Sequence, residues 1–371
     1  MILHTFSLQN FRSFKEKKII FSPQATLIIG NNAIGKTNLL EAIYLLATGK
    51  SFHAQKDIEM ISYETEIARI NGGTTTDLNL SIVLANNSQL VPSFKKIFQV
   101  NGVNKRWRDF AGNLKCVLFR PEDIDLVLGS PSLRRHYLDS VLEQVDWQYR
   151  VCNLAYQKGI RQRNKLLDKI RDGLAQQTQL LFWNQLLSKN GEIISQKREA
   201  FINFINDFLA SDTKMKSIHH FVNLAIFYDK SVISQERLEK YLEAEIATGS
   251  TLVGPHRDDI KFEIRNSPAL GFALVRPGKF ETNRDLSLYG SRGEQRMAVL
   301  ALKLAELAFI TKKSGERPIL LLDDIFSELD DQHRKDVYDL IFDQQTILTT
   351  TDEQLIPPKF YAKMKIVKLE S

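Results

Sequence analysis

A glycine-rich segment near the N-terminus has the residue types and the spacing of a phosphate-binding loop. Residues Gly30 to Thr37 read Gly-Asn-Asn-Ala-Ile-Gly-Lys-Thr and match the pattern GxxxxGK[ST]. In such a loop the backbone N–H groups surround the phosphates of a nucleotide, the lysine reaches the β- and γ-phosphates, and the threonine hydroxyl coordinates Mg²⁺. A chance glycine turn is the alternative interpretation.

The residues on either side of this loop predict the elements that must hold it. Ala25–Ile29 is an apolar run of strand length, and Lys36–Thr48 carries apolar residues at the three-to-four spacing of a helix, with Gly49 as its stop. Such a helix directs its N-terminal dipole at the same anion. Because both neighbours are in place, the segment predicts an ATP site with Mg²⁺. The expected nucleotide contacts are Gly30, Asn31, Asn32, Ala33, Ile34, Gly35, Lys36, Thr37 and Asn38, with Thr37 also a metal ligand.

Two consecutive carboxylates follow an apolar segment far along the chain. Ile319–Leu322 fits a strand buried on both faces of a parallel sheet, and Asp323 and Asp324 come directly after it. Open α/β sheets bind ligands at the carboxyl ends of their strands. We therefore expect Asp323 to hold Mg²⁺ through water and Asp324 to polarise the water that attacks the γ-phosphate. A buried strand that ends in a polar turn explains this segment equally well by itself, and the loop at Gly30–Thr37 favours the catalytic interpretation.

A third segment, Ser291–Arg296, opens an apolar helix predicted over Glu294–Ile310. Ser291 and Glu294 have the spacing of a capping box. A capped helix N-terminus with exposed N–H groups also suits an incoming γ-phosphate, so the structural and the functional interpretations are compatible. The sequence does not say to which molecule that γ-phosphate belongs.

Lys36 and Asp323 lie too far apart in sequence for a single sheet crossover, so an insertion must separate the two halves of the nucleotide-binding sheet. From Pro131 to about Leu209 leucine recurs at helical spacing without a proline, which predicts two or three helices. Short strands with turns at Asn71–Gly73 and Asn101-Gly102 precede this region. We predict an ATPase head formed by residues 1–120 and 251–371, with an inserted helical lobe at 121–250. A compact kinase or GTPase is disfavoured, and no guanine-reading NKxD motif is present.

The composition permits this assignment without demanding it. The chain has 371 residues, 43% of them hydrophobic and 25% charged, which suits about two globular domains. No apolar run approaches the ~20 residues of a membrane span, and Met1–Phe6 has no signal or transit pattern. Cys116 and Cys152 lack metal-ligand spacing. These features predict free thiols in a reducing, cytoplasmic location with no membrane partner.

The net charge of +6 is concentrated in one segment. Arg150–Arg171 carries seven basic residues and one acidic residue, so its net charge equals that of the whole chain. Four of these cations fall on one helix face and could neutralise DNA phosphates without reading sequence. A solvated helix face is the alternative interpretation. The four residues are Lys158, Arg161, Lys165 and Lys169.

Other polar segments leave structural and functional interpretations open. Lys105–Arg108 is a second DNA candidate whose Trp107 could stack on a base, although a half-buried edge turn is favoured there. Arg134 and Arg135 suit either a phosphate or ion pairs within the lobe. His256 and Arg257, after the turn at Gly254-Pro255, suit structural hydrogen bonds as well as a functional role.

Taken together, these motifs resemble the RecF DNA replication and repair proteins, relatives of ABC and SMC-type ATPase heads. The resemblance extends over nearly the whole chain, and GPHRDD and SRGEQR are its most specific motifs. The segments that carry it are Leu8–Phe14, Gly30–Thr37, Gly49–Phe52, Phe119–Asp123, Gly129–Pro131 with Arg134 and Arg135, Gln162–Asn164, Gly254–Asp259, Ser291–Arg296, Asp323 with Asp324, and Ser327–Asp330.

The resemblance implies an α/β, ABC-type P-loop ATPase head with a mixed sheet and an inserted, mainly helical lobe. In such heads two protomers sandwich two ATP molecules, and each loop faces the partner's signature segment. Ser291, Gly293, Glu294 and Gln295 would take that role here, and Asp330 would lie at the dimer interface beside the nucleotide. The resemblance also implies an ATP-dependent DNA clamp on single-stranded, gapped or duplex DNA with little sequence preference, acting in recombinational repair, replication and the SOS response. RecR and RecO would be its partners in loading a recombinase, and its ATPase would be weak and DNA-stimulated.

Two departures bear on the mechanism. Asp324 stands where many ABC-type ATPases carry glutamate, and the shorter side chain favours slow hydrolysis. Thr349-Thr350-Thr351 follows the last strand in place of a histidine, which makes Thr350 a candidate γ-phosphate sensor. The alternatives are an ATPase subunit of a transporter, disfavoured by the long insertion, and an ATPase-coupled nuclease. A nuclease needs an additional acidic metal domain, and the sequence after Asp330 is too short to contain one.

Overall fold

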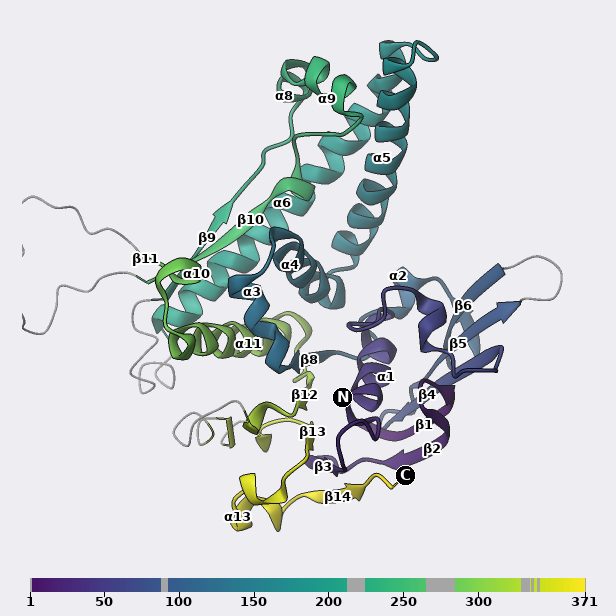
Figure 1. Cartoon of the computed structure of the whole chain (residues 1–371), viewed down its shortest axis with the longest axis vertical. Helices are drawn as coiled ribbons and strands as arrows, with labels where there is room; N and C mark the ends of the chain where they lie inside the picture. Colours follow the sequence, from purple (N-terminus) through teal and green to yellow (C-terminus); the bar gives the residue numbers. More distant parts are fainter. Residues whose placement is uncertain are drawn as a thin grey trace, which may run out of the picture. The chain divides into compact units, whose positions relative to one another are not determined.

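The chain forms two compact units in a computed structural model (Figure 1). Unit 1 comprises Met1–Asp123 and Glu306–Ser371, and unit 2 comprises Ile124–Ala305. The structure describes residues 2–87, 93–211, 224–264, 284–327, 334, 337–338 and 341–370.

A five-stranded parallel sheet in unit 1 has the order β14-β3-β13-β12-β8. All of its strands except β14 are buried along their whole length, as expected for parallel strands covered on both faces. Helix α1 (Lys36–Thr48) packs against this sheet and has the bounds predicted from its periodicity. Gly49 ends it in the left-handed conformation, with φ 73°. The strands are β3 (Ala25–Ile29), β8 (Cys116–Phe119), β12 (Ile319–Asp323), β13 (Thr346–Thr350) and β14 (Lys365–Lys368).

The second sheet of unit 1 is antiparallel, with six strands in the order β2-β1-β4-β5-β6-β7. Its inward side chains join α1 in one hydrophobic core. Helix α2 (Trp107–Phe110) follows its last strand, and α13 (Pro358–Tyr361) precedes β14. The strands are β1 (Leu3–Phe11), β2 (Phe14–Ile20), β4 (Ile67–Thr74), β5 (Asn79–Asn87), β6 (Ser93–Val100) and β7 (Val103–Lys105).

The two turns predicted in this sheet have different outcomes. Asn101-Gly102 is a hairpin turn, with φ of 50° and 78° as a two-residue turn of this kind requires. The predicted turn at Asn71–Gly73 is wrong, because these residues lie inside β4. A Cβ on Gly72 would lie 2.4 Å from Leu46 of α1, so the glycine allows the helix to approach the sheet rather than the chain to turn.

Unit 2 is built on three long helices, where the sequence predicts two or three from Pro131 to about Leu209, and α5 and α6 lie along one another (Figure 1). A three-stranded antiparallel sheet, β11-β10-β9, accompanies them. The long helices are α4 (Pro131–Val145), α5 (Trp147–Arg171) and α6 (Leu180–Ser211), and the strands are β9 (Leu224–Asp229), β10 (Asp259–Ile264) and β11 (Arg284–Asp285). The short helices are α3 (Asp125–Leu128), α8 (Gln235–Lys240), α9 (Leu242–Thr248) and α10 (Leu286–Tyr289), and α11 (Arg292–Ser314) continues into unit 1.

The second boundary of the units differs from the predicted one. Residues 251–305 cluster with unit 2 rather than with the head. The reason is pairing that no local pattern reveals: β10 pairs with β9 along its length, and Asp259 at its start binds Arg134 of α4. Within the described residues, no helix is long and apolar enough to cross a membrane.

Candidate nucleotide-binding site

The phosphate-binding loop joins β3 to α1 in unit 1, as its pattern predicts. Gly35 begins the helix with φ 107°, a conformation that favours glycine. A Cβ at Gly35 would lie 2.9 Å from the ring of Phe14 and 2.9 Å from Ser13 Oγ. Asn38, in the first turn of α1, donates a hydrogen bond from Nδ2 to Ser13 Oγ at 3.2 Å. The loop is therefore packed against the segment that connects β1 to β2.

Lys36 is buried inside the loop that it serves. Its Nζ donates to the carbonyl oxygens of Gly30 at 2.7 Å and Asn31 at 3.0 Å. Burial lowers the pKa of Lys36, while the carboxylates of Asp324 and Asp323 favour its charged form and oppose that shift. The ammonium is thus held by neutral carbonyls in the field of the two carboxylates. Thr37, the next residue, lies at the start of α1.

The strand order brings the loop and the carboxylates to the same edge of the sheet. β13 lies between β3 and β12 and is parallel to both, so the carboxyl ends of all three strands meet. Asp323 is the last residue of β12 and is buried. Asp324 follows it with φ 48°, an uncommon conformation for a residue other than glycine. Sequence positions far apart are therefore neighbours in unit 1.

Two threonines at the end of β13 have different partners. Thr349 donates from Oγ1 to Asp323 Oδ1 at 2.7 Å and accepts from the backbone N–H of Asp324 at 3.0 Å. Thr350 donates from Oγ1 to the carbonyl of Asp352 at 3.1 Å. The candidate sensor Thr350 thus binds the loop that follows it. Thr349, which the sequence interpretation did not single out, contacts the carboxylate of Asp323 and the backbone of Asp324. The signal in the sequence that could have identified Thr349 is the run of threonines at the end of the predicted strand near Thr346–Leu348.

The opening motif Leu8–Phe14 braces α1 through an ion pair. Arg12 donates from Nε and Nη2 to the two carboxylate oxygens of Glu41 at 2.9 and 2.8 Å. Ser51 donates from Oγ to the same carboxylate at 2.5 Å. Glu41 is buried on α1, so its charge is stabilised by this bidentate pairing. The motif holds the helix that presents the loop.

The signature segment Ser291–Arg296 belongs to unit 2 and forms the predicted capping box. The backbone N–H of Ser291 donates to Glu294 Oε2 at 2.7 Å, and that of Glu294 donates to Ser291 Oγ at 3.2 Å. The hydrogen bond from Ser291 is the largest cause that lowers the pKa of Glu294, which Arg284 assists. Gln295 is buried and donates to the carbonyls of Leu286 and Gly290. A Cβ on Gly293 would find open space beyond Ser291 Oγ. Asp330 lies outside the described residues.

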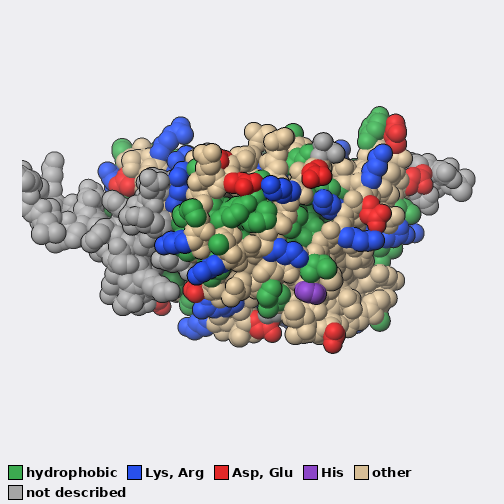
Figure 2. Space-filling view, turned by 90° about the horizontal axis from the view of Figure 1, so that it is seen from below, with side chains coloured by type: hydrophobic (Ala, Val, Ile, Leu, Met, Phe, Trp, Pro, Cys, Tyr) green, Lys and Arg blue, Asp and Glu red, His purple; other side chains and the backbone are tan. Residues whose placement is uncertain are grey.

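The four cations predicted to form a basic stripe on α5 differ in burial from Arg163 of the same helix. Lys158, Arg161, Lys165 and Lys169 all lie at the surface of the helix rather than in its core. Arg163, by contrast, is fully buried and forms an ion pair with Glu245 at 2.6 Å. On the face of the molecule that is seen from below, which is not the end that carries α5 in Figure 1, Lys and Arg side chains are spread among hydrophobic and uncharged ones (Figure 2). The α5 stripe is therefore defined by burial as well as by spacing.

Trp107 has the structural environment of a packed residue. Its Nε1 donates to the carbonyl of Thr48 at 2.8 Å, and a Cβ on Gly49 would lie 2.5 Å from its ring. The ammonium of Lys50 lies over the ring, 4.6 Å from its centroid. The indole therefore covers the end of α1, and one face of the ring is occupied by a cation.

The remaining polar candidates are joined within unit 2. Arg134 binds both carboxylate oxygens of Asp259 at 2.6 and 2.9 Å, and Arg135 donates to the carbonyl of Asp258 at 2.8 Å. His256 Nε2 donates to the carbonyl of Thr251, an acceptor that fixes the tautomer. These contacts agree with the structural interpretation of the sequence, in which the two arginines form ion pairs or hydrogen bonds within the lobe and His256 forms structural hydrogen bonds. The same interpretation suits Arg257, which donates to the carbonyl of Thr251 at 3.0 Å.

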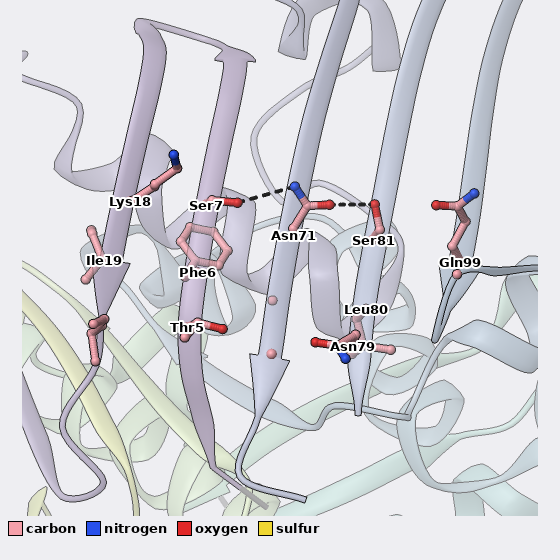
Figure 3. Close-up of a pocket in the computed structure, with 14 residues that line it drawn as sticks. Thr5, Phe6, Ser7, Lys18, Ile19, Asn71, Asn79, Leu80, Ser81 and Gln99 are labelled. Carbon is pink, nitrogen blue, oxygen red and sulfur yellow. Dashed lines mark hydrogen bonds between the residues drawn. The ribbon is translucent and has the colours of Figure 1, made fainter. Parts of the chain in front are cut away.

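An open pocket of about 690 Å³ lies on the outward face of the antiparallel sheet of unit 1 (Figure 3). Polar side chains from neighbouring strands form a row there: Asn71 donates from Nδ2 to Ser7 Oγ at 3.3 Å and accepts from Ser81 Oγ at 2.7 Å. The residues that line the pocket come from the strands and turns of that sheet, and the phosphate-binding loop and the carboxylate pair are not among them. This pocket is therefore separate from the nucleotide site.

Comparison with known proteins places this geometry in a family. A family model described as RecF/RecN/SMC N terminal domain matches residues 2–364. The DNA replication and repair protein RecF of Natranaerobius thermophilus is 37% identical over 372 residues, covering 95% of this chain and 91% of the relative. RecF of Shouchella clausii is 33% identical over 370 residues, covering 95% and 93%. The chain belongs to the RecF family.

Solved structures agree in fold. The "Structure of the recombination mediator protein RecF-ATPrS in RecFOR pathway" matches with a TM-score of 0.81 and 30% identity, covering 96% of this chain and 94% of that one. An SMC head bound to the C-winged helix domain of ScpA matches with a TM-score of 0.50 and 17% identity, which concerns the fold alone. The predicted fold class, an α/β ATPase head of the RecF and SMC kind, is confirmed. In place of the predicted mixed sheet, unit 1 has one parallel and one antiparallel sheet, because its parallel and antiparallel strand pairs lie in separate sheets.

Proposed function

We propose that this protein binds and slowly hydrolyses ATP, and that ATP controls its dimerisation on DNA during recombinational repair and replication-fork maintenance. The observation that carries the proposal is the meeting of the Gly30–Thr37 loop with Asp323 and Asp324 at one edge of the parallel sheet. Membership of the RecF family supports it, because a solved relative is named as RecF-ATP.

Each residue of the site has a role that its environment suits. Lys36 is already positioned inside the loop, so its side chain can exchange the carbonyls of Gly30 and Asn31 for phosphate oxygens. Thr37 and Asp323 would hold Mg²⁺ with the oxygen ligands that it prefers, Asp323 through a water molecule. The cation neutralises charge on the β- and γ-phosphates when it is bound. Asp324 orients and polarises the attacking water.

The site requires a second protomer in this proposal. Ser291 caps α11, and Gly293 and Glu294 lie in its first turn. A Cβ on Gly293 would meet open space, and a helix N-terminus is where a γ-phosphate can bind. These residues lie in unit 2, whereas the loop lies in unit 1. The partner's signature segment, with Asp330 beside it, would complete the ATP site. The dimer therefore forms only when ATP is bound. Gln295 holds the segment in place through hydrogen bonds to the carbonyls of Leu286 and Gly290.

DNA binding is assigned to the surface cations on α5, which contact phosphates and carry no base-specific geometry. Hydrolysis then times release rather than transforming the DNA. RecR and RecO are the expected partners in loading a recombinase on single-stranded or gapped DNA, as one relative is described as the mediator of a RecFOR pathway.

Light scattering with and without ATP, Mg²⁺ and gapped DNA tests this proposal on the wild type, Lys36→Met and Asp324→Asn. The wild type is expected to form dimers in ATP that decay as hydrolysis proceeds. Lys36→Met should form no ATP-driven dimers, and Asp324→Asn should accumulate them, because a general base contributes on the order of 10²–10⁴-fold to the rate. A dimer population indifferent to ATP would refute the sandwich mechanism. Equal behaviour of the two variants would refute the role of Asp324.

A further inference from the structure

Thr349 occupies the central position of the nucleotide site. Its strand, β13, runs between β3 and β12, and Thr349 pairs in register with Asp323 on one side and with Ile28 on the other. Its side chain is 1% exposed. The residue therefore lies between the strand that leads into the phosphate-binding loop and the strand that ends in the carboxylates.

The hydroxyl of Thr349 bonds to two neighbours at once, because a hydroxyl can both donate and accept a hydrogen bond. Asp323 Oδ1 can only accept a hydrogen bond, and the backbone N–H of Asp324 can only donate one. Thr349 Oγ1 donates to the first at 2.7 Å and accepts from the second at 3.0 Å. The carbonyl of Leu322 is farther away, at 3.5 Å, so the single proton goes to the carboxylate.

These two bonds control different properties of the carboxylate pair. The first sets the rotation of the Asp323 carboxylate through Oδ1 and leaves Oδ2 for a ligand. The second holds the backbone at Asp324, whose φ of 48° is a conformation that a non-glycine residue keeps only when its surroundings hold it. One hydroxyl thus orients the side chain of the first aspartate and the main chain of the second.

We propose that Thr349 is a positioning residue that presents Asp323 to the divalent cation of the nucleotide and places Asp324 for hydrolysis. The proposal rests on the proposed ATP site. Neighbouring threonines of the same strand do not share this role. Thr350 bonds to Asp352 in the following loop, and Thr346, also buried, donates to the carbonyl of Ile341 at 2.7 Å.

Thr349→Val tests this role because valine keeps the shape of threonine and removes the hydroxyl. Thr349→Ser keeps the hydroxyl and removes a methyl group. Thr346→Val is the matched control, since it deletes another buried hydroxyl of β13 that does not touch a carboxylate. Thr349→Ala deletes the same hydroxyl with less bulk and replaces the valine variant if that one does not fold.

Two measurements separate positioning from structural support. Calorimetry gives the affinity for a slowly hydrolysed thiophosphate analogue of ATP in Mg²⁺ and in EDTA, and a steady-state assay gives the turnover of ATP as Mg²⁺ is titrated. We expect Thr349→Val to lose about 10-fold or more of its Mg²⁺-dependent affinity and turnover, the range for a lost hydrogen bond to a metal ligand. Its affinity in EDTA should stay within about twofold, since the loop is untouched. Thr349→Ser and Thr346→Val should resemble the wild type in both measurements.

The positioning role is refuted if Thr349→Val retains wild-type Mg²⁺ dependence and turnover, or if Thr349→Ser is as impaired as the valine variant. A loss of melting temperature alone, equal in Thr349→Val and Thr346→Val, would also refute it. Failure of the wild type to bind the analogue is a different result, because it overturns the proposed ATP site and the positioning role with it.

Discussion

Buried charges are neutralised differently at the nucleotide site of unit 1 and in the helical core of unit 2. At the site the ammonium of Lys36 is held by two backbone carbonyls, and the carboxylate of Asp323 by a hydroxyl. In unit 2 the guanidinium of Arg198, only 2% exposed, is held by the carboxylates of Asp139 at 2.7 Å and Asp258 at 2.9 Å. The first set has neutral partners, and the second has partners of opposite charge.

This difference indicates which charges serve a ligand. A charge whose hydrogen bonds go to neutral groups keeps its field available for a phosphate or a metal. A charge that is paired with a buried counter-ion is already neutralised and attracts a ligand weakly. Removing such a charge leaves its counter-ion buried and uncompensated. Arg163 and Glu245 repeat the second pattern, with both side chains fully buried. By this criterion we propose that the charges of Lys36 and Asp323 serve a ligand, whereas those of Arg163 and Arg198 stabilise the fold.

The largest effect expected from this comparison is on stability. Arg198→Met should destabilise unit 2 by about 3–5 kcal/mol, because it strands Asp139 and Asp258 without their counter-ion. Lys36→Met should cost less, about 1–2 kcal/mol, since it removes two hydrogen bonds to carbonyls and the attraction of Asp323 and Asp324 but breaks no ion pair at hydrogen-bond distance among the described residues. Hydrogen exchange followed by mass spectrometry, resolved by peptide, measures each unit separately. Similar losses in the two variants would contradict the distinction between the two sets of charges.

A smaller effect concerns the neutral histidine of unit 2. His256 accepts at Nδ1 from Tyr156 and donates at Nε2 to Thr251, and burial lowers its pKa from 6.5 to about 4. The unfolded chain therefore binds a proton in the window from pH 6.5 to 4 that the folded chain does not. Its contribution to stability is complete above pH 6.5 and falls by about 3 kcal/mol as the pH drops to 4.

Denaturant unfolding of wild type and His256→Gln at pH 7.5 and pH 5 measures this contribution. Glutamine offers both a donor and an acceptor without titrating in that window. Acidic groups titrate in both proteins, so their effect cancels in the comparison. The wild type should therefore lose more free energy of unfolding than the variant between the two pH values, because only the wild type has the imidazole of His256. An identical pH dependence of the two proteins would show that His256 does not carry the effect.

The smallest effect on stability is expected for the basic stripe of α5. Replacing Lys158 and Lys165 with glutamine should change stability by no more than about 0.5 kcal/mol. The same change should weaken DNA binding and reduce the slope of log affinity against log salt by about 1.4–1.8, because two DNA phosphates are no longer neutralised. Fluorescence anisotropy across a salt series measures that slope. The control is Lys359 and Lys365 replaced together, an equal charge change in unit 1, and an equal slope change there would refute a local DNA contact.

Local features of this protein were predictable because their causes are local. The loop, its flanking strand and helix, and the capping box at Ser291 each depend on residues within one or two turns of the chain. Helix α1 has the predicted bounds because its apolar spacing and Gly49 define them. The predicted turn at Asn71–Gly73 was wrong for the opposite reason: Gly72 makes room for Leu46 of α1, a helix distant in sequence, and no local pattern contains that contact.

The sequence by itself determined that a phosphate-binding loop, a carboxylate pair and a capped helix exist, and that an insertion separates them. Only the tertiary structure decided which charges became neighbours. Strand order placed β13 between β3 and β12 and so gave Thr349 its contact with Asp323. Burial divided one basic helix into a paired Arg163 and a surface Lys165. Both outcomes depend on contacts between residues distant in the chain, because desolvation and strand pairing are set by the packed surroundings rather than by sequence spacing.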